Sequence, residues 1–136
     1  MKNLLKVINS LLLIGILVSL NSCKKDDTPP PPDINTYTVK YTVFCTGAPL
    51  SQYPVSYIKN GTTYTHIVTI PSGTTLIQWD DSYYGTTGDN VSVSCTPPYA
   101  SGFSQYVSLK IEYNAMTLVM ANANYPNTAN ASGTLP

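Results

Sequence analysis

The stretch Tyr37-Thr38-Val39-Lys40-Tyr41-Thr42-Val43-Phe44-Cys45 decides the fold class of this chain. Its odd positions are apolar or aromatic and its even positions are mostly polar, which is the period of two of a strand with one buried face. Similar runs recur along the chain, separated by Gly, Pro and Asn. They predict strands over residues 37–45, 52–59, 62–70, 74–80, 90–96, 105–113 and 116–123, with a short last strand over 129–135.

Seven or eight short strands with frequent turns indicate a single antiparallel, immunoglobulin-like β-sandwich over residues 36–136. Asn60-Gly61 predicts a two-residue hairpin of type I′. Pro54 predicts that 52–59 is an edge strand or carries a bulge, because proline lacks a ladder donor. The strand 116–123 is apolar on both faces and is therefore predicted to be central, and residues 81–89 are predicted to be a loop.

The composition excludes one class of function. The chain has 136 residues, a formal net charge of zero and no arginine, and the predicted domain has only Lys40, Lys59 and Lys110. A nucleic-acid-binding protein needs a basic patch that neutralises phosphates. Three scattered lysines do not make such a patch, so no nucleic-acid partner is expected.

The N-terminus has the layout of a bacterial lipoprotein signal. Lys2 and Lys6 precede an apolar stretch over residues 11–20, and Ser22-Cys23 follows it. We expect residues 1–22 to be removed and Cys23 to carry a diacylglycerol, with a further acyl chain such as palmitate on the new amino terminus. An ordinary signal peptide and an uncleaved anchor helix are the alternatives. Two or more acyl chains anchor a protein stably to a membrane.

Residues 23–35 predict an anchored tether. The run Thr28-Pro29-Pro30-Pro31-Pro32-Asp33 cannot form a helix or a paired strand and favours extended polyproline II. Residues 24–33 are therefore expected to act as a spacer about 30 Å long. The Lys-Asp-Asp after Cys23 resembles the lysine-plus-acidic signal that directs lipoproteins of Bacteroidota-type bacteria to the outer face of the outer membrane. The expected location is the cell outer membrane, surface-exposed or otherwise facing the periplasm.

Two cysteines remain for the domain. Cys45 and Cys95 each lie on the apolar face of a predicted strand. In an exported protein this arrangement predicts a disulfide, and two buried free thiols are the alternative. No cofactor is predicted.

The order of several short motifs resembles a known family. They are Tyr41-Thr42-Val43, Val55-Ser56-Tyr57 before Asn60-Gly61, Val68-Thr69-Ile70-Pro71, Val91-Ser92-Val93-Ser94 after Gly88, Val107-Ser108-Leu109-Lys110-Ile111, and Ala129-Asn130-Ala131-Ser132-Gly133. This order is similar to the small accessory proteins of the mycobacterial membrane protein family (MmpS-type). The resemblance implies an immunoglobulin-like outer domain that assists a membrane transporter. The Asn114-Ala115 turn and the lipid anchor depart from that family.

Acidic and aromatic residues are the candidate site residues. Asp80, Asp81 and Asp89 flank the predicted loop and could ligate calcium through oxygen, with solvated loop acids as the alternative. Five aromatic residues at or beside two predicted loops could stack on a sugar or fill a partner's pocket, with packing over the sheet ends as the alternative. These five candidates are Trp79, Tyr83, Tyr84, Tyr99 and Phe103.

These observations predict a function without catalysis. The sequence contains no recognisable catalytic constellation, so we expect no enzyme. The predicted function is a lipid-anchored binding or accessory module of the cell envelope that contacts the membrane through the lipid on Cys23 and assists a membrane transporter. The alternative is a glycan-binding or adhesion module that uses the loop aromatics.

Overall fold

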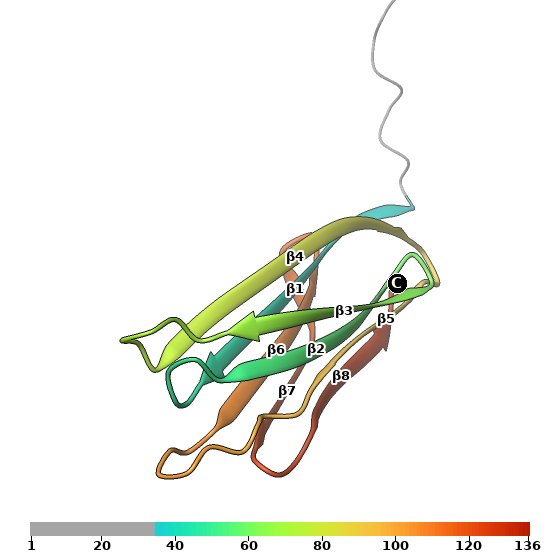
Figure 1. The fold of residues 1–136 in the computed structure, drawn as a ribbon. Coiled ribbons are helices and arrows are strands. Elements are labelled where there is room, and N and C mark those ends of the chain that lie inside the picture. Colours follow the sequence, from blue (N-terminus) through green and yellow to red (C-terminus); the bar gives the residue numbers. More distant parts are fainter. Residues whose placement is uncertain (1–34) are drawn as a thin grey trace, which may run out of the picture. The chain divides into compact units, whose positions relative to one another are not determined.

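The computed structural model describes residues 35–136, and within that range it contains eight antiparallel strands and no helix. The strands form two four-stranded sheets, in the orders β4-β1-β6-β7 and β3-β2-β5-β8 (Figure 1). The fold is an all-β sandwich, which confirms the predicted class. The strands are β1 (Thr36–Thr46), β2 (Gln52–Lys59), β3 (Thr62–Thr69), β4 (Leu76–Thr86), β5 (Asn90–Cys95), β6 (Tyr106–Tyr113), β7 (Met116–Asn124) and β8 (Ala129–Thr134).

β1 is an interior strand of the first sheet. It pairs antiparallel with β4 along its whole length and with β6 from Val39 onward. Its alternation places one row of side chains against the second sheet and leaves the other row half-buried. Because a slip of one residue would expose the whole apolar row, this strand fixes the register of its sheet. The four inward residues are Val39, Tyr41, Val43 and Cys45, all 0% exposed.

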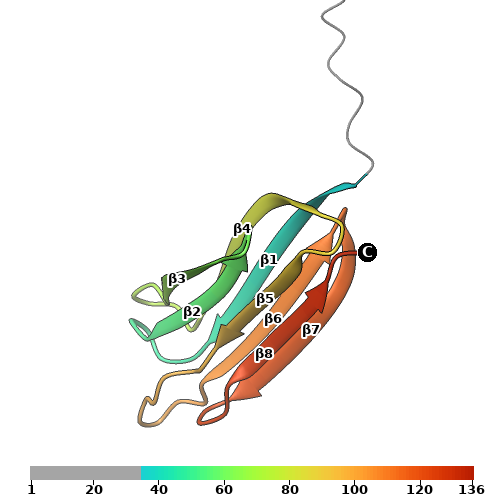
Figure 2. The ribbon, with the colours of Figure 1, turned by 90° about the vertical axis from the view of Figure 1, so that its right-hand side faces the viewer.

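The core lies between the inner faces of the two sheets, and valine is its commonest residue, followed by tyrosine and alanine. At one margin β7 and β8 are in extensive contact, whereas β3 and β4 barely touch at the opposite margin (Figure 2). The sandwich is therefore closed along one side and open along the other. We call the margin between β3 and β4 the open side.

Both hairpins use two-residue turns with positive φ at both positions. Asn60 and Gly61 have φ angles of 51° and 71°, and Asn114 and Ala115 have 45° and 64°. These angles match a type I′ turn, which confirms the predicted turn at Asn60-Gly61. The Asn114 turn is also fixed to β1, because Thr38 N donates to Asn114 Oδ1 at 3.0 Å.

The two turns give a matched pair of expected stability changes. Ala115→Gly is expected to raise the free energy of unfolding by about 1 kcal/mol, because alanine is strained at positive φ and glycine is not. Gly61→Ala, at the equivalent position of the other turn, is expected to lower it by about 1 kcal/mol. Urea unfolding of the two variants and the parent measures both changes. Two changes of the same sign would contradict this account of the turns.

Three strand assignments differ from the sequence prediction. β2 lies inside its sheet despite Pro54, and its ladder with β5 begins at Val55, so Pro54 lies outside that ladder. β7 is an edge strand although both its faces are apolar. β4 continues through most of the predicted loop as far as Thr86, because the inward alternation of Ile77 and Trp79 extends past residue 80.

The two ends of the described segment lie at the same end of the sandwich. Thr87 N donates to Asn35 O and Gly88 N donates to Leu135 O, each at 3.0 Å. The opposite end carries the four longer loops, over residues 47–51, 70–75, 96–105 and 125–128 (Figure 1). We call it the loop end.

Several predictions are not tested by the described residues. The signal peptide, Cys23 and nearly all of the tether lie in residues 1–34, outside the described range. The strand order does not by itself establish an immunoglobulin-like topology, which stays a prediction.

Candidate functional site

A hollow of about 430 Å³ lies at the loop end, between the loop before β6 and the end of β7. Tyr125 N donates to Gln105 O at 3.1 Å and so holds the two segments together. The Tyr99 ring packs against the Tyr125 ring with centroids 5.5 Å apart, which adds a third aromatic side chain beside the hollow. The residues that line the hollow are Phe103, Ser104, Gln105, Asn124 and Tyr125.

Exposed rings and amides meet at this hollow. Tyr99, Phe103 and Tyr125 are 71%, 49% and 46% exposed. Large aromatic side chains that stay in solvent next to amide groups suit a ligand with an apolar face and hydroxyl groups. We call Tyr99, Phe103 and Tyr125 the loop-end aromatics.

Gln105 is the only buried polar residue among residues 35–136, at 3% exposed. Tyr53 Oη donates to Gln105 Oε1 and lies 2.7 Å from Thr46 O, while Gln105 Nε2 has no partner among the described residues. If the amide oxygen and nitrogen of Gln105 were exchanged, Nε2 could donate to Tyr53 Oη, but Oε1 would then have no hydrogen-bond donor among the described residues. Either orientation therefore leaves one polar atom of a buried amide unpaired, which is costly unless a ligand or solvent satisfies it.

Gly47 shapes the wall behind this amide. A Cβ atom at Gly47 would lie 2.6 Å from Tyr53 Oη and would overlap Gln105 Oε1. Since all three residues are buried, a larger side chain at residue 47 would have to displace the amide or the tyrosine ring. Glycine at position 47 therefore leaves the space that the Gln105 amide occupies.

The structure divides the five predicted aromatic contacts into separate groups. Tyr99 and Phe103 lie together at the loop end. Tyr84 is 75% exposed on the outer face of β4, whereas Tyr83 is 8% exposed on its inner face and is not available to a ligand. Trp79 is half-buried and packs against the core. Tyr125, Gln105 and Asn124 were not predicted as site residues.

A second aromatic group lies on the open side. The His66 ring stacks on Trp79 with centroids 5.0 Å apart, and Tyr57 contacts Trp79 at 5.3 Å. Tyr64 stacks on Tyr57 at 5.7 Å. These residues come from β2, β3 and β4, and their register places them on the inner faces of the two sheets. We call Tyr57, Tyr64, His66 and Trp79 the open-side cluster.

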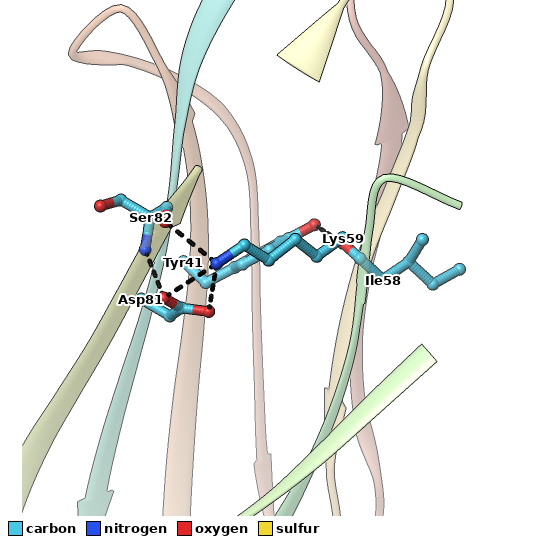
Figure 3. A network of polar contacts seen from close by, with 5 residues as sticks. All are labelled: Tyr41, Ile58, Lys59, Asp81 and Ser82. Atoms are coloured by element: carbon cyan, nitrogen blue, oxygen red, sulfur yellow. Dashed lines mark hydrogen bonds and ion pairs between the residues drawn. The ribbon is translucent and has the colours of Figure 1, made fainter. Parts of the chain in front are cut away.

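A polar network joins the two sheets next to this cluster (Figure 3). Lys59 on β2 lies 3.4 Å from Asp81 Oδ2 on β4, and Lys59 Nζ also donates to Ser82 O at 3.3 Å. Tyr41 Oη donates to the carbonyl oxygen of Ile58. Asp81 therefore points inward and has an intersheet partner, which explains why an acid is tolerated on the inner face of β4.

The three predicted acids do not come together. Asp80 is exposed and pairs with Lys40 at 3.5 Å, Asp81 points inward to Lys59, and Asp89 Oδ2 accepts from Thr86 N at 2.8 Å. Partial desolvation raises the pKa of Asp80, but hydrogen bonds and the nearby lysine outweigh it and lower the pKa. Within residues 35–136 there is no group of three or more histidine, cysteine or acidic residues that could hold a metal ion. The calcium hypothesis for these three residues stays a prediction.

The predicted disulfide is not formed in the structure. Cys45 on β1 and Cys95 on β5 are both buried free thiols, so the register of both residues was predicted correctly but their bond was not. The two strands belong to opposite sheets, so a bond between these residues would be an inter-sheet disulfide. Burial raises the pKa of each thiol to about 12, and Cys95 adds to the increase at Cys45.

Comparison with known proteins adds no relative. No protein-family model matches the sequence, and no curated protein matches it. The part of the chain that the structure describes contains no helix long and apolar enough to cross a membrane.

Proposed function

We propose that this protein is a non-enzymatic, lipid-anchored binding module of the cell envelope, and that it binds a glycan at the loop end. The observation that supports the proposal is the hollow of about 430 Å³, lined by aromatic rings and by amide and hydroxyl groups. A sugar ring has an apolar face that stacks on an aromatic ring, and its hydroxyl groups pair with amides. The loop-end aromatics and Gln105 supply both kinds of contact.

The position of the hollow also supports binding at a surface. The chain enters the domain at Asn35, which is bonded to the turn after β4, and the loop end lies at the other end of the strands. If Cys23 carries the lipid anchor, the domain is attached to the membrane through the end opposite the loop end, where the glycan is proposed to bind. A ligand outside the cell would then reach the hollow without passing the point of attachment.

An accessory role beside a membrane transporter, as the MmpS-type resemblance implies, is the second candidate. The observation that favours it is β3, an uncharged edge strand that is exposed over most of its length. Such an edge suits contact with another polypeptide. Cross-linking in the native membrane followed by mass spectrometry tests this role, and recovery of no transporter subunit would exclude it.

The glycan proposal is tested by affinity electrophoresis of the full chain through gels that contain laminarin, mannan, pullulan or pectin. We expect at least one polysaccharide to retard the protein. Phe103→Ala and Tyr125→Ala are each expected to weaken binding about tenfold, the effect of losing one stacking contact of about 1.4 kcal/mol. Tyr84→Ala is the matched control, because Tyr84 is an even more exposed aromatic residue that lies on β4, and it is expected to leave binding unchanged.

Trp79 fluorescence distinguishes the two aromatic groups. In their sheet β4 is two strands from β6 and three strands from β7, so about 10–14 Å of strand spacing separates Trp79 from the segments that line the hollow. Glycan binding at the loop end is therefore expected to leave Trp79 emission unchanged. Retardation by none of the polysaccharides, or a Trp79 shift that disappears in His66→Ala, would overturn the loop-end assignment.

A further inference from the structure

β3 is an edge strand without the features that usually prevent edge-to-edge association. Seven of its eight residues are exposed, and only Val68 is buried. It contains no proline, no lysine and no acid, and its ladder with β2 has no bulge. Natural sheets usually protect such an edge with charge, proline or a bulge. β4 is the edge strand that faces β3 across the open side. Unlike β3, it carries charged residues, Asp80 and Asp81.

The hairpin geometry shows which backbone groups of β3 face outward. In a two-residue hairpin the flanking residues, here Lys59 and Thr62, exchange hydrogen bonds, and bonded pairs then alternate along an antiparallel ladder. The backbone groups of residues 62, 64, 66 and 68 therefore face β2. Those of Thr63, Thr65 and Ile67 face away from the sheet, where the described part of the chain supplies no neighbouring strand.

This edge is complementary to itself. Consider two copies of β3 that pair antiparallel about a two-fold axis. A residue a given number of positions before the axis then faces the residue the same number of positions after it in the other copy, and the two side chains must lie on the same face of the sheet. An axis between two residues would pair an inward side chain with an outward one, so the axis must pass through a residue. An axis at Thr65 pairs Tyr64 with His66 of the other copy and Thr63 with Ile67, whereas an axis at His66 would place two imidazoles opposite each other.

We propose that a second copy of this chain pairs with β3 in an antiparallel arrangement about Thr65, which joins two four-stranded sheets into one of eight strands. Thr63, Thr65 and Ile67 supply the backbone hydrogen bonds. Tyr64 and Ile67, now 45% and 48% exposed, become covered. The pairs are aromatic–aromatic, threonine–threonine and threonine–isoleucine, all of which are favourable across strands. The proposal is independent of the glycan site.

The expected affinity is modest. One pair of eight-residue strands buries less than the roughly 800 Å² per partner of a standard stable interface. We therefore expect a dissociation constant of about 10–100 µM in solution. Charge does not oppose the pairing, since β3 has no residue with a permanent charge.

The first test is sedimentation velocity of the full chain in detergent, from about 1 µM to about 1 mM. The parent is expected to shift from monomer to dimer across this range. Thr65→Lys places two like charges opposite each other on the exposed face and is expected to weaken the dimer at least tenfold. Met120→Lys is the control, because Met120 is 61% exposed on the edge strand β7, and it is expected to leave the dimer intact.

Cysteine cross-linking tests the register directly. Thr65→Cys lies on the axis, so mild oxidation is expected to give a disulfide-linked dimer. Thr63→Cys alone is expected to give none above the parent, but Thr63→Cys combined with Ile67→Cys is expected to cross-link. A monomer at every concentration, a dimer unaffected by Thr65→Lys, or equal cross-linking by Thr63→Cys and Thr65→Cys would each overturn the proposal.

Discussion

Replacing Gly47 with alanine is expected to lower the free energy of unfolding by about 2–4 kcal/mol. The added methyl group would overlap the Gln105 amide and crowd Tyr53 Oη, and all of these atoms are buried. The side chains would have to move, and the hydrogen bond between them would be lost. Urea unfolding followed by circular dichroism measures the change. Glycan binding at the loop end is expected to weaken with it, because Gln105 lines the hollow.

A double variant separates the overlap from other effects of the substitution. Gln105→Ala removes the amide with which the new methyl group collides, so Gly47→Ala is expected to cost less than half as much in the Gln105→Ala background as in the parent. If Gly47→Ala in the parent lowered the free energy of unfolding by less than about 0.5 kcal/mol, Gln105 and Tyr53 would be able to move aside at little cost. That result would contradict the role of Gly47 described above.

The domain is expected to unfold in alkali at about pH 11. Cys45, Cys95, Tyr41 and Tyr53 are 0–2% exposed. Burial raises the pKa of both thiols from 9.0 to about 12 and raises the pKa of both phenols far above 10.0. The native state therefore keeps protons that the unfolded state loses, and stability falls as pH rises. Each group costs about 1.4 kcal/mol per pH unit above its unfolded pKa, about 8 kcal/mol in total by about pH 11.

Two measurements check this account. Urea unfolding between about pH 7 and about pH 11 is expected to show full stability below pH 9 and a steep loss above it. Tyr41→Phe is expected to cost about 1–3 kcal/mol at neutral pH, because the Ile58 carbonyl loses its donor, but to make the alkaline loss shallower. Alkylation in denaturant without reductant is expected to modify both Cys45 and Cys95. Stability that is constant up to about pH 11 would contradict the buried titration.

Most strand boundaries, except the end of β4, were predictable because alternation and turn chemistry agree along most of this chain. The interior position of β2 and the edge position of β7 were not, because strand order depends on long-range pairing that a local pattern does not encode. A proline is excluded only from ladder positions that need a backbone N–H donor. Pro54 is tolerated in β2 because the ladder with β5 begins at Val55. The apolar outer face of β7 remains partly exposed, with Met116 and Met120 in solvent.

The candidate site was only half predictable. Tyr99 and Phe103 were found because they lie in an obvious loop. Tyr125 was missed although a signal existed, since counting back from the Asn114-Ala115 turn places Gln105 close to residues 123–125. A bulge between Ile111 and Glu112 shifts that count by one residue, so that Tyr106 pairs with Asn124. Gln105 itself reads as an ordinary polar residue in sequence, and only the packing of Gly47 and Tyr53 shows that it is buried.

The double pairing of β1 has a mechanical consequence. A pull that enters through Asn35, against a ligand held at the loop end, would load β1 along its own axis. β1 is bonded to β4 and to β6 at once, so the ladders on both sides would have to shear together instead of opening one bond at a time. Resistance to force is governed by the rate of unfolding. If a cell adhered through this domain in flowing liquid, the load would therefore fall on β1, the strand that also fixes the register of its sheet.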